Sequence, residues 1–148
     1  MQVTAKAEYA LRAATLLASS GPGPVKSEAI AAAEDIPLRF LHNILASLTR
    51  AGILSSLRGA DGGYELTRAP TAISVADIIR AVEGPYAAGG GPDVPEGPTA
   101  RRGGNDALRA VWAVLRANER AVLELVTLAD LVSGRLPDMS TVGRFTGA

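Results

Sequence analysis

A cluster of side chains between residues 39 and 50 has the chemistry needed to bind the edges of nucleotide bases. Arg39 can donate two hydrogen bonds to guanine, and Asn43 can bind adenine in the same bidentate way. His42 and Arg50 offer further donors, while Phe40 can face either the bases or the protein interior. Taken alone, each of these residues also fits an ordinary solvated helix face. The apolar residues between them recur at helical spacing and are expected to be buried: Leu41, Ile44, Leu45 and Leu48.

The elements around this cluster predict a helix-turn-helix motif. Residues Ser27 to Glu34 form a short helix, Asp35-Ile36-Pro37 makes a tight break, and a longer helix follows from Leu38 to Ala51. In such a motif the second helix places its amino-terminal side chains in the major groove of DNA. Lys26 and Ser27, at the start of the first helix, can bind a phosphate together with the unpaired amides of that helix.

A β-hairpin is predicted directly after the motif. Short strands over residues 53–58 and 64–67 flank a turn rich in Gly and Asp. Arg58 precedes this turn and can enter the negatively charged minor groove. Gly62 and Gly63 would allow the hairpin tip to approach DNA closely, although they also fit an ordinary hairpin turn. A helix-turn-helix followed by such a hairpin, or wing, is a winged helix.

Further amphipathic patterns complete a mainly α-helical domain. Helices are predicted over Thr4–Ser20 and, after a Ser74 cap, over Val75–Val82. With the motif and the wing they form a winged helix-turn-helix DNA-binding domain over residues 1–83. Gly and Pro dominate residues 84–104, where we expect a flexible loop.

A long dimerisation helix is predicted over residues 105–133, followed by a flexible tail over residues 134–148. At about 1.5 Å per residue this helix would be roughly 40 Å long. Its apolar positions alternate three and four apart, which is typical of a coiled-coil seam. The polar Asn118 on this seam either sets the register or is an ordinary surface residue. The predicted seam residues are Leu108, Val111, Trp112, Leu115, Asn118, Val122, Leu125 and Ala129.

The composition excludes several classes of function. The chain has no cysteine, which excludes disulfides, thiolate nucleophiles and cysteine-held iron–sulfur clusters, and its single histidine cannot form a histidine metal site. We therefore predict no enzyme, no cofactor and no metal. No apolar run is long enough to cross a membrane, and charges at Lys6, Glu8 and Arg12 exclude a signal peptide, so a cytoplasmic protein is expected.

The charge balance is the observation that least favours DNA binding. The chain has 15 basic and 15 acidic residues, so a positive DNA-binding face must come from placement. Two alternatives therefore stay open. The first is a regulator that binds a small molecule in a pocket between the long helix and the winged domain, with Trp112 and Tyr86 as lining residues. The second is a protein-interaction module that does not touch DNA.

Read in order, these segments resemble the Rrf2 family of bacterial transcription regulators. The resemblance covers residues 1–84, and the long helix fits the dimerisation helix of the family. The hairpin segment is its most specific part. The matching segments are Ala5–Arg12, Ile36–Leu41, Leu48–Leu54, Ser56–Leu66, Ile73–Ile79 and Val82–Gly84.

The resemblance implies a homodimer on a near-palindromic operator, with double-stranded DNA as its partner. It implies that Arg58 is the wing arginine and that Arg39, His42 and Asn43 contact bases. Relatives often carry Glu and Gln at the positions of His42 and Asn43. The resemblance therefore does not define the operator sequence that this chain would bind. Many relatives hold an iron–sulfur cluster with cysteines before the long helix, sometimes with a first-helix Glu to which Glu8 corresponds. Without cysteines, a cluster-free repressor with another effector is expected.

Overall fold

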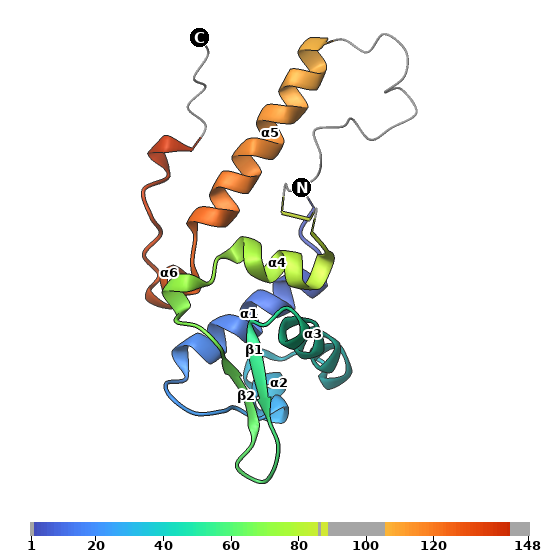
Figure 1. Ribbon diagram of the computed structural model, residues 1–148, viewed down its shortest axis with the longest axis vertical. Coiled ribbons are helices and arrows are strands. Elements are labelled where there is room, and N and C mark those ends of the chain that lie inside the picture. The colour runs from blue at the N-terminus through green and yellow to red at the C-terminus, as the bar shows by residue number, and fades with distance from the viewer. Residues whose placement is uncertain (1, 86, 89–105, 143–148) are drawn as a thin grey trace.

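The computed structural model describes residues 2–85, 87–88 and 106–142 (Figure 1). Most of the predicted flexible loop, part of the predicted tail and Tyr86 lie outside these residues. The elements in chain order are α1 (Ala5–Ser19), α2 (Ser27–Glu34), α3 (Leu38–Arg50), β1 (Leu54–Leu57), β2 (Gly63–Leu66), η1 (Pro70–Ala72), α4 (Val75–Glu83), α5 (Asp106–Leu125), α6 (Leu128–Ser133) and η3 (Met139–Thr141).

Small residues on α1 allow the other helices to pack closely around it. Thr4 caps this helix by accepting a hydrogen bond from the Ala7 amide at 3.0 Å. The buried face of α1 is mostly alanine, and it contacts α3, α4 and α6. The largest fully buried side chains complete this core: Ile30, Leu41, Ile44, Leu45, Leu48, Leu54, Ile73, Ile78 and Leu128. The predicted buried face of the second motif helix is thus part of the core.

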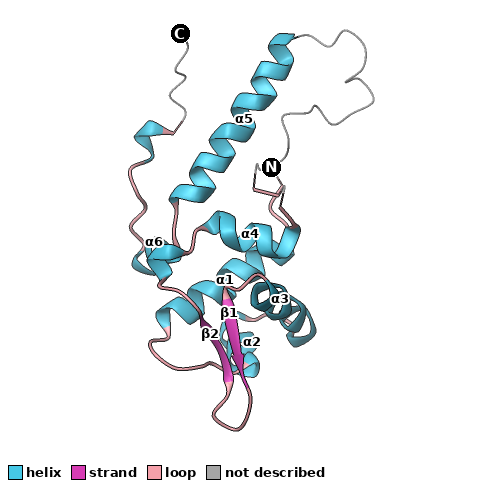
Figure 2. Cartoon of the chain, viewed as in Figure 1, coloured by secondary structure: helices cyan, strands magenta, loops and turns pink. Residues whose placement is uncertain are grey.

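Strands β1 and β2 form a two-stranded antiparallel hairpin that extends from one end of the helical core (Figure 2). Leu54 pairs with Leu66, and Leu57 pairs with Gly63. The amides of Val25 and Tyr64 each donate to the carbonyl of the other, at 2.9 and 2.8 Å. This bridge fixes the hairpin to the segment that enters α2. The predicted mainly helical fold with a small hairpin wing is confirmed.

The single helix predicted over residues 105–133 is wrong. Helix α5 ends at Leu125, and α6 begins at Leu128. Between α5 and α6 the backbone forms hydrogen bonds with residues around the start of α4. The Val75 amide donates to the Val126 carbonyl, and the Leu128 amide donates to the Ile73 carbonyl. Thr127 then starts α6 with a capping box. These bonds replace the intrahelical bonds that a continuous helix would need, so Ala129 belongs to α6 rather than to the long helix.

Helix α5 projects away from the core on the side opposite the hairpin tip (Figure 1). Its 20 residues correspond to about 30 Å rather than the predicted 40 Å. Within the described ranges, no helix has both the length and the apolar character needed to cross a membrane.

Candidate nucleic-acid interface

The exposed face of α3 carries the side chains predicted to read bases. Helix α2 ends at Glu34 and is followed by Asp35, whose left-handed backbone (φ 52°) turns the chain sharply; Pro37 then precedes the first residue of α3. Because Leu41 and its apolar neighbours face the core, Arg39 and Asn43 are exposed on the opposite side. His42 and Arg50 are also exposed, as is Phe40, whose exposed fraction is 59%. This face contains hydrogen-bond donors and acceptors on a rigid helix.

The start of α2 lies beside α3 and brings three predicted residues together. His42 Nε2 lies 3.3 Å from Ser27 Oγ, and the Ser27 hydroxyl also donates to Glu28 Oε2 at 3.2 Å. Ser27 is buried, with an exposed fraction of 9%, while Lys26 is exposed. Lys26 is therefore the more accessible group for a phosphate, and Ser27 connects the two helices.

Glu28 is a functional neighbour that the predicted site did not include. A hydrogen bond from its own backbone amide and another from the Ser27 hydroxyl lower its pKa, with smaller contributions from Lys26 and His42. Glu28 therefore keeps its negative charge beside this part of the interface. Its position two residues after Lys26 was the available signal.

The wing presents Arg58 at the start of its loop, fully on the surface. The structure shows why Gly62 and Gly63 are needed for packing of the wing. A Cβ on Gly62 would overlap the Leu57 carbonyl, and Gly62 is buried. Gly63 has φ 147°, and a Cβ there would lie 2.5 Å from the Val25 carbonyl oxygen. Close packing inside the wing and against Val25 therefore requires both glycines.

The ion pairs of the described residues lie outside the candidate interface. Arg12 pairs with Glu34, Arg109 with Asp106, and Arg68 and Arg80 both pair with Asp77. In the same described ranges, no ion pair involves the basic residues of the candidate interface: Lys26, Arg39, Arg50 and Arg58. The ion pairs of Arg12, Arg68, Arg80 and Arg109 thus lie outside the candidate interface and leave its cations available for an anionic partner.

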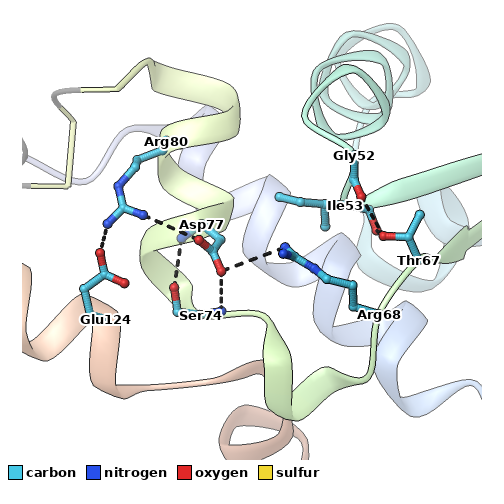
Figure 3. A network of polar contacts seen from close by, with 8 residues as sticks. All are labelled: Gly52, Ile53, Thr67, Arg68, Ser74, Asp77, Arg80 and Glu124. Atoms are coloured by element: carbon cyan, nitrogen blue, oxygen red, sulfur yellow. Dashed lines mark hydrogen bonds and ion pairs between the residues drawn. The ribbon is translucent and has the colours of Figure 1, made fainter.

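A polar network connects the base of the wing to the end of α3 (Figure 3). The Thr67 hydroxyl donates to the carbonyl oxygens of Gly52 and Ile53, at 2.6 and 3.2 Å. Gly52 and Ile53 directly follow α3, so the hydroxyl ties the end of this helix to the chain that leaves β2. The Thr67 hydroxyl thus links the wing to the helix that carries the exposed face.

The same network continues to α5 through α4 (Figure 3). Arg68 Nη2 lies 4.0 Å from Asp77 Oδ2, and Asp77 also accepts the Ser74 amide at 3.0 Å in the capping box of α4. Arg80 pairs with Asp77 at 3.4 Å and reaches Glu124 of α5. Sequence reasoning found the Ser74 cap but not the Arg80–Glu124 ion pair, whose two members are far apart in sequence.

Helix α5 has no buried residue, and the predicted seam lies largely on the surface. The exposed fractions are 50% for Leu108, 51% for Val111, 49% for Trp112 and 52% for Leu115. The structure thus places these residues on the exposed face of one helix, with Asn118, Val122 and Leu125 further along the same helix. The Asn118 side-chain amide donates to Val114 of its own helix at 3.0 Å.

A cavity of 270 Å³ lies between α5 and the winged domain, where a small-molecule site was considered. Glu83 and Glu119 line it, together with Val3 and Ile79. Trp112 is not among its lining residues, and Tyr86 lies outside the described residues.

A helix-turn-helix with an exposed polar recognition face and an adjoining hairpin defines a winged-helix protein of the DNA-binding class. The sequence model of the Rrf2 family, described as "Iron-dependent Transcriptional regulator", matches residues 3–134. The chain belongs to the Rrf2 family.

Individual relatives agree with this assignment. An HTH-type transcriptional regulator of Mycobacterium tuberculosis H37Rv, Rv1287, is 45% identical over 139 residues, covering 93% of this chain and 85% of the relative. The structure of CymR, the global cysteine regulator of Bacillus subtilis, has a TM-score of 0.76 at 32% identity and covers 90% of this chain and 98% of that one. The IscR structure from T. potens has a TM-score of 0.73 at 32% identity, covering 90% and 88%.

The donor set does not fit the iron–sulfur cluster that occurs in this family. Cysteine thiolates hold such clusters, and the chain has no cysteine. Its one histidine, His42, faces Ser27 on the candidate interface. Among the described residues there is no group of three His, Asp or Glu side chains that could hold a metal ion.

Proposed function

We propose that this chain is a sequence-specific transcription regulator, acting as a repressor, that binds a near-palindromic operator as a homodimer. The observation that carries the proposal is the exposed face of α3, where Arg39 and Asn43 lie on the same helix as Arg50, and within the described ranges neither arginine forms an ion pair. In a major groove, these two side chains would bind guanine and adenine. Lys26 and the wing arginine, Arg58, would bind the backbone and the minor groove.

The exposed seam of α5 supports the homodimer. An exposed apolar stripe needs a partner surface, and about half of each large apolar side chain of the stripe is exposed: Leu108, Val111, Trp112 and Leu115. A second copy of the same helix provides a matching stripe from Leu108 to Leu125. Two recognition helices related by a two-fold axis would then read two half-sites, which explains a near-palindromic operator.

This regulator would respond to an effector other than an iron–sulfur cluster, because the chain lacks the cysteine thiolates that hold such a cluster. A small molecule or a protein partner would then act as effector on a cytoplasmic protein. The family and its relatives are transcription regulators, and no enzymatic reaction is proposed.

Fluorescence anisotropy with DNA from upstream of the chain's own gene tests the proposal. The double substitution Arg39→Ala and Arg58→Ala should weaken binding strongly, because such contacts are worth about 1–3 kcal/mol each. Arg135→Ala is the matched control, since Arg135 is exposed beyond α6. Undiminished binding by the double variant would refute the proposed contact surface. Absence of binding at low salt would instead favour the protein-interaction module.

A further inference from the structure

We propose that the groove between α1 and α3 binds the DNA backbone, on the flank of α3 opposite Lys26. This proposal rests on the proposed function and adds Lys6 and Tyr9 to the interface. The groove has a volume of about 520 Å³. Lys6 and Tyr9 of α1 form one wall, and Phe40, Asn43 and Arg50 of α3 form the other.

The groove is continuous with the base-reading face, because Asn43 belongs to both. Successive residues of a helix are about 100° apart, so His42 and Phe40 project on opposite flanks of α3. His42 faces Ser27 at the start of α2, whereas Phe40 lines the groove toward α1. The two flanks of the recognition helix thus border different parts of the protein.

The dimensions of DNA explain why both flanks would meet a backbone. The major groove is about 12 Å wide, and a helix with its side chains is about 10–12 Å in diameter. A helix inserted there has a phosphate strand on each side. In the proposed function Lys26 binds the phosphate strand on one side of α3. The α1–α3 groove would bind the phosphate strand on the other side.

The chemistry of the groove matches a sugar–phosphate segment. Lys6 and Arg50 are exposed, and across the described ranges neither forms an ion pair. The Ser47 hydroxyl accepts a hydrogen bond from Arg50 Nη2 at 3.3 Å, which orients the guanidinium at the groove. The exposed ring of Phe40 offers an apolar surface for a deoxyribose. Cations beside an apolar wall therefore complement the anionic phosphate and the less polar sugar.

The wall formed by α1 is held in place by a second set of contacts. The Arg12 guanidinium lies over the Tyr9 ring, 5.7 Å from its centroid, and Arg12 is itself paired with Glu34 at 3.2 Å. Tyr9 is thus fixed between the groove and the α2 helix that carries Glu34. A prepositioned wall lowers the ordering cost of binding.

Two substitutions that change the charge of the groove test whether it binds DNA. Lys6→Gln removes a cation while keeping most of the side-chain length. Ala5→Glu adds an anion to the groove lining at the first position of α1, where a negative charge favours the helix. The controls are Arg135→Gln for the first and Ala72→Glu, at an exposed residue of η1, for the second.

Binding to operator DNA and to a scrambled duplex would be measured by anisotropy over a range of salt concentrations. Lys6→Gln should weaken binding to both duplexes by a similar factor and reduce the slope of log K against log salt by about 2 for the dimer, about 1 for each protomer. Ala5→Glu should also weaken both without lowering the thermal midpoint, and the controls should match the wild type.

Unchanged affinity and salt slope in both groove variants, with operator preference retained, would overturn this inference while the proposed function stands. The groove would then belong to an occupant other than DNA. Failure of the wild type to prefer any operator would instead refute the proposed function itself.

Discussion

The exposed seam of α5 predicts how strongly a single leucine contributes to dimerisation. Leu115 lies in the middle of α5, and 52% of it is exposed in the single chain. Full burial of a leucine side chain is worth about 1.5–3 kcal/mol, so burying the exposed half contributes about 0.8–1.6 kcal/mol. A symmetric dimer contains two copies, and Leu115→Ala should therefore cost about 1–3 kcal/mol of association free energy.

This cost corresponds to a rise of roughly 5- to 140-fold in the dimer dissociation constant. Sedimentation equilibrium across a range of protein concentrations measures the constant directly. Leu136→Ala is the matched control, because Leu136 is 63% exposed but lies beyond α6 and off the seam. An identical dissociation constant for Leu115→Ala, Leu136→Ala and the wild type would refute the assignment of α5 as the dimer contact.

Three further substitutions test the site and the elements that hold it. Glu28→Gln should strengthen DNA binding at low salt, because it removes a charge facing the phosphates; equal anisotropy curves would contradict this. Because the pKa of Glu28 is lowered in the folded protein, its negative charge stabilises the fold at pH values above the usual carboxyl pKa, and this contribution is lost as the pH falls. Glu28→Gln should therefore lose less thermal stability than the wild type on acidification. Gly63→Ala should lower the unfolding free energy by about 1–3 kcal/mol in urea titrations, because φ 147° and the Val25 backbone oppose a Cβ. Gly59→Ala, where no atom lies within 4 Å of the added Cβ, should cost less. Asp77→Ala should lose about 0.5–2 kcal/mol with the α4 cap, and Asp77→Asn, which keeps an acceptor, should lose less; equal losses would assign the effect to the ion pairs.

Local sequence signals predicted the parts of the fold that depend on neighbouring residues. The period of Leu41, Ile44, Leu45 and Leu48 defined the buried face of α3, and it also left Arg39 and Asn43 on the opposite side. The Ser74 cap was likewise visible, because a capping box depends on residues three positions apart.

The errors arose where distant segments decide the structure. The apolar period continued past Leu125, but hydrogen bonds to Ile73 and Val75 interrupt the helix there. Position 63 requires glycine because the Val25 backbone, which is far away in sequence, leaves no room for a Cβ. The α1–α3 groove was missed for the same reason, since no local pattern relates Lys6 to Arg50.

The central claim is that α3 reads a two-fold-symmetric DNA sequence, and selection from a random duplex library followed by sequencing tests it most directly. The wild type should enrich a near-palindrome whose half-sites are about one helical turn, or a multiple of it, apart. Arg39→Ala should lose the preference at one position in each half-site and keep the remainder of the motif. Enrichment of no sequence by the wild type at low salt, or of the identical motif by Arg39→Ala, would contradict the account.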